Sequence, residues 1–210
     1  MENIQVLTKT NHIKKAQEKE DIMLNKERQE EVVELCQHLI QKQSYSGHED
    51  GVAGVLEEQL KKKGFDSVTV DKYGNVIGCI KGNRPGKKIL FDGHIDTVPV
   101  TDETEWQYPP FAAEIHDGKI YGRGTSDMKG AVAGFVTAAA AFAEDTKKDF
   151  AGEIYVAGVV HEECFEGVAA REISSFVKPD YVVIGEASQL NIKIGQRGRG
   201  EIVLETFGKP

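Results

Sequence analysis

The segment 91–99 combines residue types that bind metal ions, because Asp92, His94 and Asp96 stand at alternate positions in it. A neutral imidazole is a good zinc ligand, and a nearby carboxylate can hold its second ring nitrogen and thereby fix its tautomer. The segment follows a short apolar run at 88–91 that is typical of a strand, and open α/β sheets bind ligands where their strands end. A metal site and a polar loop that ends in a Val-Pro turn both fit these residues.

The second segment, 122–130, is a glycine-rich loop that leads into an Ala-rich helix and places Asp127 in the first helical turn. Its spacing fits neither a P-loop nor a dinucleotide-binding loop, and the Asp127 carboxylate would occupy the position that a phosphate needs. Two interpretations stay open. Asp127 is either a simple helix N-cap or a metal ligand that the helix N-terminus keeps ionised.

Two further acidic segments also follow apolar runs. Glu162 and Glu163 come after the run 154–160, and Glu186 comes after the run 181–184. Adjacent carboxylates repel each other, so both are buried only where a cation or a shared proton compensates their charge. A solvated loop is the alternative for the Glu162–Glu163 pair, and Glu186 taken alone indicates little.

The order of the expected elements predicts an α/β fold with a mixed, largely parallel sheet that helices cover on both faces. Apolar residues recur at helical spacing in two N-terminal segments, and strand and turn signals begin after Gly64. The expected helices lie at 26–43, 52–64, 128–143 and 167–176. The expected strands lie at 65–70, 76–80, 88–91, 154–160, 181–184, 192–194 and 202–206, with a hairpin at 115–120. Of these strands, 154–160 and 181–184 are expected to be buried.

If the acid-bearing strands are neighbours, their polar ends meet at one edge of the sheet. One His with several carboxylates suits Zn²⁺, Mn²⁺ or Co²⁺ rather than copper or an iron–sulfur cluster. There are more carboxylates than one ion requires, which indicates a two-metal site with a bridging carboxylate. The remaining Glu is then free to act as a general base.

Composition narrows the function classes. The chain has 210 residues, with 26 Lys and Arg against 34 Asp and Glu, a formal net charge of −8. Nucleic-acid binding needs a basic face, so we predict no nucleic-acid partner. The longest apolar runs are too short for a transmembrane helix, and we predict no membrane partner. Three widely spaced Cys without a CxxC pair suit a reducing, cytoplasmic location.

Taken in order, the four segments resemble the di-zinc metallopeptidase family that includes acetylornithine deacetylase, succinyl-diaminopimelate desuccinylase, aminoacylase and glutamate carboxypeptidase. The resemblance runs from about residue 30 to the C-terminus, with Gly93–Pro99, Gly122–Gly130, Glu162-Glu163 and Gly185–Ser188 as its motifs. One departure is that three residues separate Glu163 from Gly167, where the family has its glycine closer to the Glu pair. The second is that no segment carries the His that the family uses as its last metal ligand.

The resemblance implies two divalent metal ions, most readily Zn²⁺ with Co²⁺ or Mn²⁺ as alternatives. It assigns six side chains to the site: the metal ligands His94, Asp127, Glu163 and Glu186, the general base Glu162, and Asp96, which orients His94. Asp127 bridges the two ions in this scheme. His94 and Glu186 complete the first metal site, and Glu163 belongs to the second.

The resemblance also implies a function and a domain organisation. The function is hydrolysis of an amide bond in a small N-acyl amino acid or dipeptide; the alternative is a C-terminally truncated, inactive fragment that binds at most one metal. Residues 1–25 are expected to form a polar tail or frayed helix. Residues 26–195 form the N-terminal part of the catalytic domain, and 196–210 begin a lid or dimerisation domain, which allows a homodimer of the full-length form.

Overall fold

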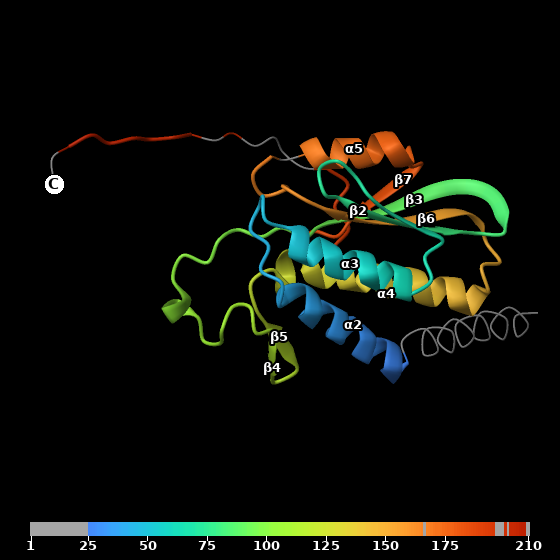
Figure 1. Ribbon diagram of the computed structural model, residues 1–210, viewed down its shortest axis with the longest axis horizontal. Helices are drawn as coiled ribbons and strands as arrows, with labels where there is room; N and C mark the ends of the chain where they lie inside the picture. The colour runs from blue at the N-terminus through green and yellow to red at the C-terminus, as the bar shows by residue number, and fades with distance from the viewer. Residues whose placement is uncertain (1–24, 166, 196–199, 201, 209–210) are drawn as a thin grey trace, which may run out of the picture.

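The computed structural model describes residues 25–165, 167–195, 200 and 202–208 (Figure 1). The expected N-terminal tail therefore lies outside the described residues, apart from Asn25. A five-stranded sheet forms the centre of the molecule, in the order β1-β2-β6-β3-β7. Its strands are β1 (Ser67–Val70), β2 (Val76–Lys81), β3 (Arg84–His94), β6 (Ala151–Val159) and β7 (Tyr181–Ile184).

The sheet is mixed, as the sequence predicts. Strand β3 runs parallel to both of its neighbours, β6 and β7, whereas β1-β2 and β2-β6 pair antiparallel. Strand β3 is much longer than the apolar run at 88–91 indicates. His94 is the last residue of β3, and the Glu pair and Glu186 follow shortly after the ends of β6 and β7.

Helices cover both faces of the sheet. Figure 1 shows α5 (Val168–Val177) on one face and α3 (Asp50–Lys62) and α4 (Gly130–Thr146) on the other, with α2 (Lys26–Ile40) packed outside α4. The helix α3 directs an apolar stripe inward, in which Val52, Leu56 and Leu60 are fully buried. The covered-sheet α/β fold expected from the sequence is thus confirmed. The expected hairpin is formed by β4 (Glu114–His116) and β5 (Lys119–Tyr121), which pair as a separate two-stranded sheet.

An ion-pair network joins α2 to the end of α4. The Arg28 guanidinium donates to both Asp145 carboxylate oxygens, at 2.8 and 2.6 Å, and to Glu144 at 3.1 Å. A bidentate arginine–carboxylate pair fixes direction as well as distance. The network therefore holds α2 in one orientation on α4.

Three sequence expectations about strands are wrong. Strand β7 was expected to be buried, yet all four of its residues are exposed because β7 is the edge strand and pairs only with β3. No strand forms at 192–194 or 202–206, where the described residues lack regular structure. Residues such as Ile194 and Ile202 have β-forming side chains. A strand also needs a hydrogen-bonding neighbour, however, and none of the described strands lies beside these segments.

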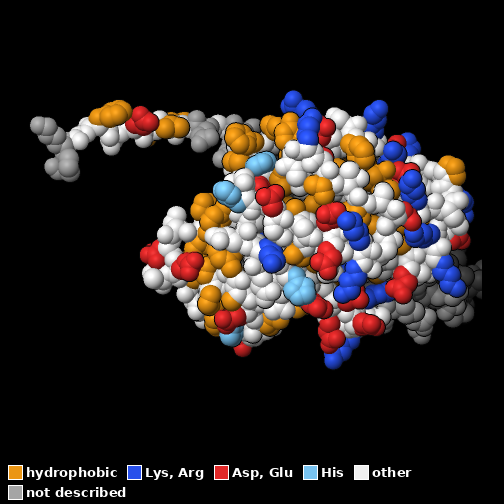
Figure 2. All heavy atoms as spheres, viewed as in Figure 1, with side chains coloured by type: hydrophobic (Ala, Val, Ile, Leu, Met, Phe, Trp, Pro, Cys, Tyr) orange, Lys and Arg blue, Asp and Glu red, His pale blue; other side chains and the backbone are white. Residues whose placement is uncertain are grey.

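The surface shows two further properties. None of the described helices is both long enough and apolar enough to cross a membrane. On the face shown in Figure 2, Lys and Arg side chains are interspersed with Asp and Glu. That face therefore presents no continuous basic surface.

The close packing around Gly158 leads to a prediction about the stability of the fold. A Cβ atom there would lie 2.3 Å from Cδ2 of the buried Leu56 and 3.1 Å from Cγ2 of Ile95. We therefore expect Gly158→Ala to lower the free energy of unfolding by about 1–3 kcal/mol, the usual cost of overpacking a core. Urea denaturation followed by circular dichroism measures this change.

The control for this prediction is Gly134→Ala in α4, where an added Cβ meets nothing within 4 Å. That substitution should raise stability by about 0.5–1 kcal/mol because alanine is a better helix former than glycine. Equal stability of Gly158→Ala and the wild-type chain would contradict the packing of α3 on β6 described above.

Candidate metal centre

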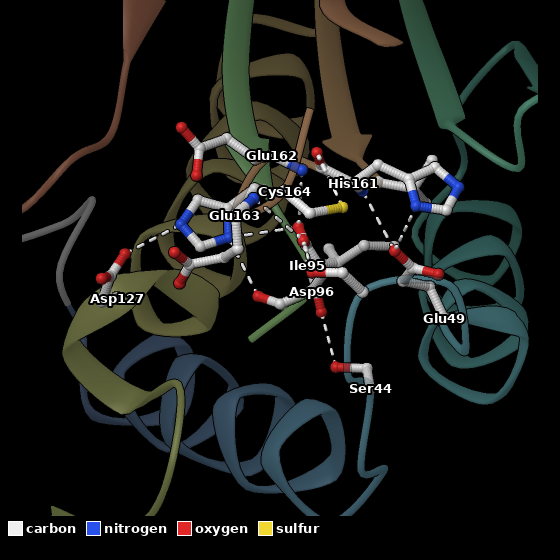
Figure 3. A network of polar contacts seen from close by, with 12 residues as sticks. Ser44, Glu49, Ile95, Asp96, Asp127, His161, Glu162, Glu163 and Cys164 are labelled. Carbon is white, nitrogen blue, oxygen red and sulfur yellow. Dashed lines mark hydrogen bonds and ion pairs between the residues drawn. The ribbon is translucent and has the colours of Figure 1, made fainter. Parts of the chain in front are cut away.

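The candidate site lies where the three parallel strands end. Strand β3 ends at His94, β6 leads into the Glu162–Glu163 turn, and β7 leads through Gly185 to Glu186. The turn before α4 brings Asp127 to the same edge, and Figure 3 shows it facing the 161–164 turn. The convergence of the polar strand ends at one sheet edge is thus present in the structure.

Three of the expected ligands lie close enough together to hold one metal ion. The Nε2 atom of His94 is 2.8 Å from Oδ1 of Asp127 and 3.6 Å from Oε1 of Glu186. One ligand atom from each of these residues lies within 4.8 Å of the other two. The imidazole is 2% exposed, whereas the side chains of Asp127 and Glu186 are 60% and 48% exposed. The candidate site therefore has a buried imidazole on one side and accessible carboxylates on the other.

Asp127 does not act as a helix N-cap. The N-cap position of α4 is Lys129, two residues later, and the Asp127 carboxylate contacts His94 instead. The expected helix start at Met128 is likewise two residues too early, because Asp127 and Met128 have non-helical backbone angles. Of the two interpretations left open by the sequence, the N-cap does not fit the structure, which places the Asp127 carboxylate beside His94.

The second ring nitrogen of His94 is held by Asp96. Nδ1 lies 2.9 Å from the backbone oxygen of Asp96 and 3.5 Å from its carboxylate. A carbonyl oxygen only accepts hydrogen bonds, so Nδ1 carries a proton and donates it. In the neutral imidazole the lone pair is then on Nε2, the atom that faces Asp127 and Glu186. This tautomer is the one that metal ligation through Nε2 requires.

The same contacts set the charge of His94 in the metal-free protein. Burial lowers the pKa of His94, but hydrogen bonds with Asp96 and Asp127 outweigh this effect and raise the pKa to about 10. Without a metal ion, His94 is therefore an imidazolium that is stabilised by the surrounding acids.

The carboxyl groups around His94 are close enough to repel one another when they are ionised. Burial raises the pKa of Glu186 and of Glu163, and the charge of Asp127 raises both further. Burial also raises the pKa of Asp92 to about 6, with Glu186 and Glu162 adding to the effect. A divalent cation would relieve this repulsion. The donor set thus fits a hard or borderline divalent ion.

Glu162 and Glu163 lie in the turn after β6 and are not part of the group formed by His94, Asp127 and Glu186. In Figure 3 the Glu163 side chain points toward Asp127, and its carboxylate is near enough for Asp127 to raise its pKa. The backbone N–H groups of Glu162 and Glu163 donate to the Asp96 carboxylate at 3.2 and 3.1 Å. Asp96 thus contacts both the imidazole and the Glu pair.

Several residues near the site were not anticipated from the sequence. Lys129 is fully buried, and its Nζ donates to the backbone oxygens of Leu39 and Lys42, at 3.0 and 2.9 Å. Burial lowers its pKa to about 8. These contacts satisfy carbonyls at the C-terminal end of α2 and tie the Asp127 turn to that helix. The only sequence signal was a Lys at the start of an otherwise apolar helix.

The connector between α2 and α3, residues 41–49, also reaches the site. Ser44 Oγ donates to the backbone oxygen of Ile95 at 2.7 Å, and Ser46 Oγ donates to the Asp96 carboxylate at 2.6 Å. Glu49 accepts a hydrogen bond from the backbone of His161. In the sequence, these residues indicate only the end of a helix.

Comparison with known proteins gives one family and a consistent set of relatives. The sequence model described as peptidase family M20/M25/M40 matches residues 90–206. The succinyl-diaminopimelate desuccinylase 2 of Ruegeria sp. is 34% identical over 188 residues, which cover 84% of this chain and 47% of that protein. The chain thus spans about half the length of the curated relatives it matches.

Solved structures resemble the fold. An M20 family metallo-carboxypeptidase from Sulfolobus solfataricus superposes with a TM-score of 0.64 at 26% identity, over 74% of this chain and 37% of that one. Human carnosine dipeptidase 1 gives a TM-score of 0.64 at 25% identity, over 75% and 38% of the two chains. Both matches support the α/β fold described above.

The three-residue group predicts how metal binding responds to mutation. Replacing Asp127 with Ala removes a ligand that lies 2.8 Å from His94, so we expect Co²⁺ affinity to fall roughly 10- to 100-fold or more. Isothermal titration calorimetry measures the affinity. Glu58→Ala, at an exposed position on α3, is the control and should bind as the wild type does. Equal affinities of Asp127→Ala and wild type would refute the site.

The raised pKa of His94 predicts the pH dependence of the same binding. A metal ion at Nε2 must displace the proton that the free protein retains up to about pH 10. Co²⁺ affinity should therefore rise about tenfold per pH unit between about pH 6 and pH 8, with release of one proton from His94. Titrations in buffers of different ionisation enthalpy measure that proton. A pH-independent affinity would be inconsistent with His94 as a ligand.

Proposed function

Because the chain belongs to peptidase family M20/M25/M40, we propose that it carries the site of a metal-dependent amide hydrolase. The observation that supports this most directly is the group of His94, Asp127 and Glu186 at the strand ends, with ligand atoms within 4.8 Å of one another. An acidic pair, Glu162 and Glu163, stands on the adjoining turn. A ligand group beside an independent carboxylate is the arrangement that metal-assisted hydrolysis requires.

We propose that the site holds two divalent ions, with zinc as the first choice. His94 and Glu186 would hold one ion and Glu163 would hold the other, with Asp127 as a ligand available to both. The exposure of the Asp127 carboxylate leaves oxygen lone pairs available beyond its contact with His94. A divalent ion bound there supplies Lewis acidity, which polarises an amide carbonyl and lowers the pKa of a bound water.

The remaining residues move the proton and fix the geometry. Glu162 accepts a proton from the attacking water as the water oxygen bonds to the amide carbon. It then delivers that proton to the leaving nitrogen as the C–N bond breaks, so that an amine and a carboxylic acid are formed. The acid loses its remaining proton to solvent and leaves as a carboxylate. Asp96 holds His94 through Nδ1 and holds the Glu162 backbone through its N–H group. Both groups thus keep their orientation during the reaction.

The substrate we propose is a small N-acyl amino acid or a dipeptide. The matched relatives include a desuccinylase and a dipeptidase by name, which supports an amide bond in a small substrate of this class. Residues 26–195 would form the N-terminal part of the catalytic domain. Any homodimer would form through a lid or dimerisation domain that residues 196–210 begin.

The role of Glu162 is testable by a substitution that keeps its shape. We expect Glu162→Gln to lower kcat by about 10²–10⁴-fold, the usual contribution of a general base, while Co²⁺ binding stays within a few-fold of wild type. The zinc-loaded chain is assayed with N-succinyl and N-acetyl amino acids and with dipeptides.

Two outcomes would contradict the proposal. One is a zinc-loaded wild-type chain that turns over none of these substrates. The other is a Glu162→Gln variant as active as wild type. Glu58→Gln on the exposed side of α3 is the matched control and should keep full activity.

A further inference from the structure

Three successive backbone N–H groups, those of His161, Glu162 and Glu163, all donate to carboxylates (Figure 3). The N–H of His161 donates to Glu49 at 3.0 Å, and the next two donate to Asp96 at 3.2 and 3.1 Å. The whole turn that carries the Glu pair is thus held by two acidic side chains from elsewhere in the chain.

Glu49 occupies the N-cap position of α3, where short polar side chains commonly accept a hydrogen bond from the first helical turn. In the described structure its side chain makes no capping hydrogen bond to α3. Instead, Oε1 accepts the N–H of His161 at 3.0 Å and lies 3.5 Å from the His161 Nδ1 atom. The carboxylate of Glu49 therefore forms its hydrogen bond with the 161–163 turn and not with the helix that it precedes.

Glu49 is only 6% exposed. A buried carboxylate is costly unless hydrogen bonds replace the water it loses. The hydrogen bond from the His161 N–H supplies part of that replacement, so the position of the turn and the burial of Glu49 depend on each other.

The backbone of the turn needs such support. His161 has a φ of +60°, the left-handed conformation that costs a residue with a side chain about 1–2 kcal/mol. A residue stays in that conformation only where its surroundings hold it there. Two backbone hydrogen bonds act directly on His161: its N–H donates to Glu49 at 3.0 Å, and its carbonyl oxygen accepts from the Phe165 N–H at 2.9 Å, within the same turn. Of the two, only the bond to Glu49 ties His161 to a distant part of the chain.

We propose that Glu49 is a positioning residue for the hydrolytic site. Its carboxylate fixes the His161 backbone, and thereby directs Glu162 and Glu163 toward the His94–Asp127–Glu186 group. Glu49 itself touches neither the substrate nor a metal ligand. Ser46 supports the same turn indirectly, because its hydroxyl donates to the Asp96 carboxylate at 2.6 Å. Only the consequence for catalysis rests on the function proposed above.

The first test measures the turn itself, in the whole chain and without metal. Amide hydrogen exchange by NMR should show the N–H groups of His161, Glu162 and Glu163 exchanging at least tenfold faster in Glu49→Ala than in wild type. The amides of β6 should keep their wild-type rates, which separates movement of the turn from general unfolding. Glu58→Ala on the same helix should leave all of these rates unchanged.

Two conservative variants keep the test decisive if Glu49→Ala fails to fold. Glu49→Gln retains an oxygen at the acceptor position, whereas Glu49→Asp retains the charge but withdraws the oxygen from the His161 N–H. We expect Gln to preserve slow exchange and Asp to lose it. The reverse order, or wild-type exchange at 161–163 in Glu49→Ala, would overturn the proposal.

The second test links the turn to the metal centre. Co²⁺ titrated into Glu49→Asp should bind the His94 group with wild-type affinity, whereas binding that involves Glu163 should weaken at least tenfold and be restored in Glu49→Gln. Wild-type binding of every Co²⁺ ion in Glu49→Asp would overturn the proposal. A wild-type chain that binds no Co²⁺ would refute the proposed function, while the exchange rates would still decide the role of Glu49.

Discussion

The geometry of the candidate site depends on one buried carboxylate, that of Asp96. It has no solvent exposure, yet hydrogen bonds from His94, Ser46 and the Glu163 backbone lower its pKa despite the opposing effect of burial. A buried charge is tolerated only when such partners are supplied in full. The partners of Asp96 come from the end of β3, the α2–α3 connector and the turn after β6. One side chain therefore fixes three parts of the chain that are distant in sequence.

The ends of β3 and β6 leave room for the turn that contains Asp127. In the parallel pairing of β3 with β6, Gly93 lies opposite Gly158 one step before the strands end. A Cβ at Gly93 would come within 2.9 Å of Met128 Cε, so the missing side chain lets the residue after Asp127 pack against β3. Fully buried Lys129 then ties the same turn to α2. Asp127 reaches His94 because a glycine and a buried lysine fix the turn on either side of it.

The sequence predicts what depends on near neighbours and misses what depends on distant ones. The covered α/β sheet and the polar residues that follow its strands can be predicted from local apolar runs, whereas the expected roles of His94, Asp127 and Glu186 came from the resemblance to a family. The hydrogen bond between Glu49 and His161 joins residues 112 positions apart, and no local pattern indicates it. The exposure of β7 was missed for the same reason, because an apolar run does not reveal whether a strand lies at the edge of a sheet.

The two sides of the site differ in a way that explains its chemistry. On the inner side, the carboxylates of Asp96 and Glu49 are buried and taken up by hydrogen bonds that fix position. On the outer side, Asp127 and Glu186 are partly exposed and face His94, and the charge of Asp127 adds to burial in raising the pKa of Glu186 and of Glu163. The inner acids thus fix the imidazole and the Glu pair, while the outer acids bring negative charge to the Nε2 side of His94. A proton on His94 neutralises part of that charge, and a divalent cation at the proposed site would neutralise more, so the two would compete for the imidazole.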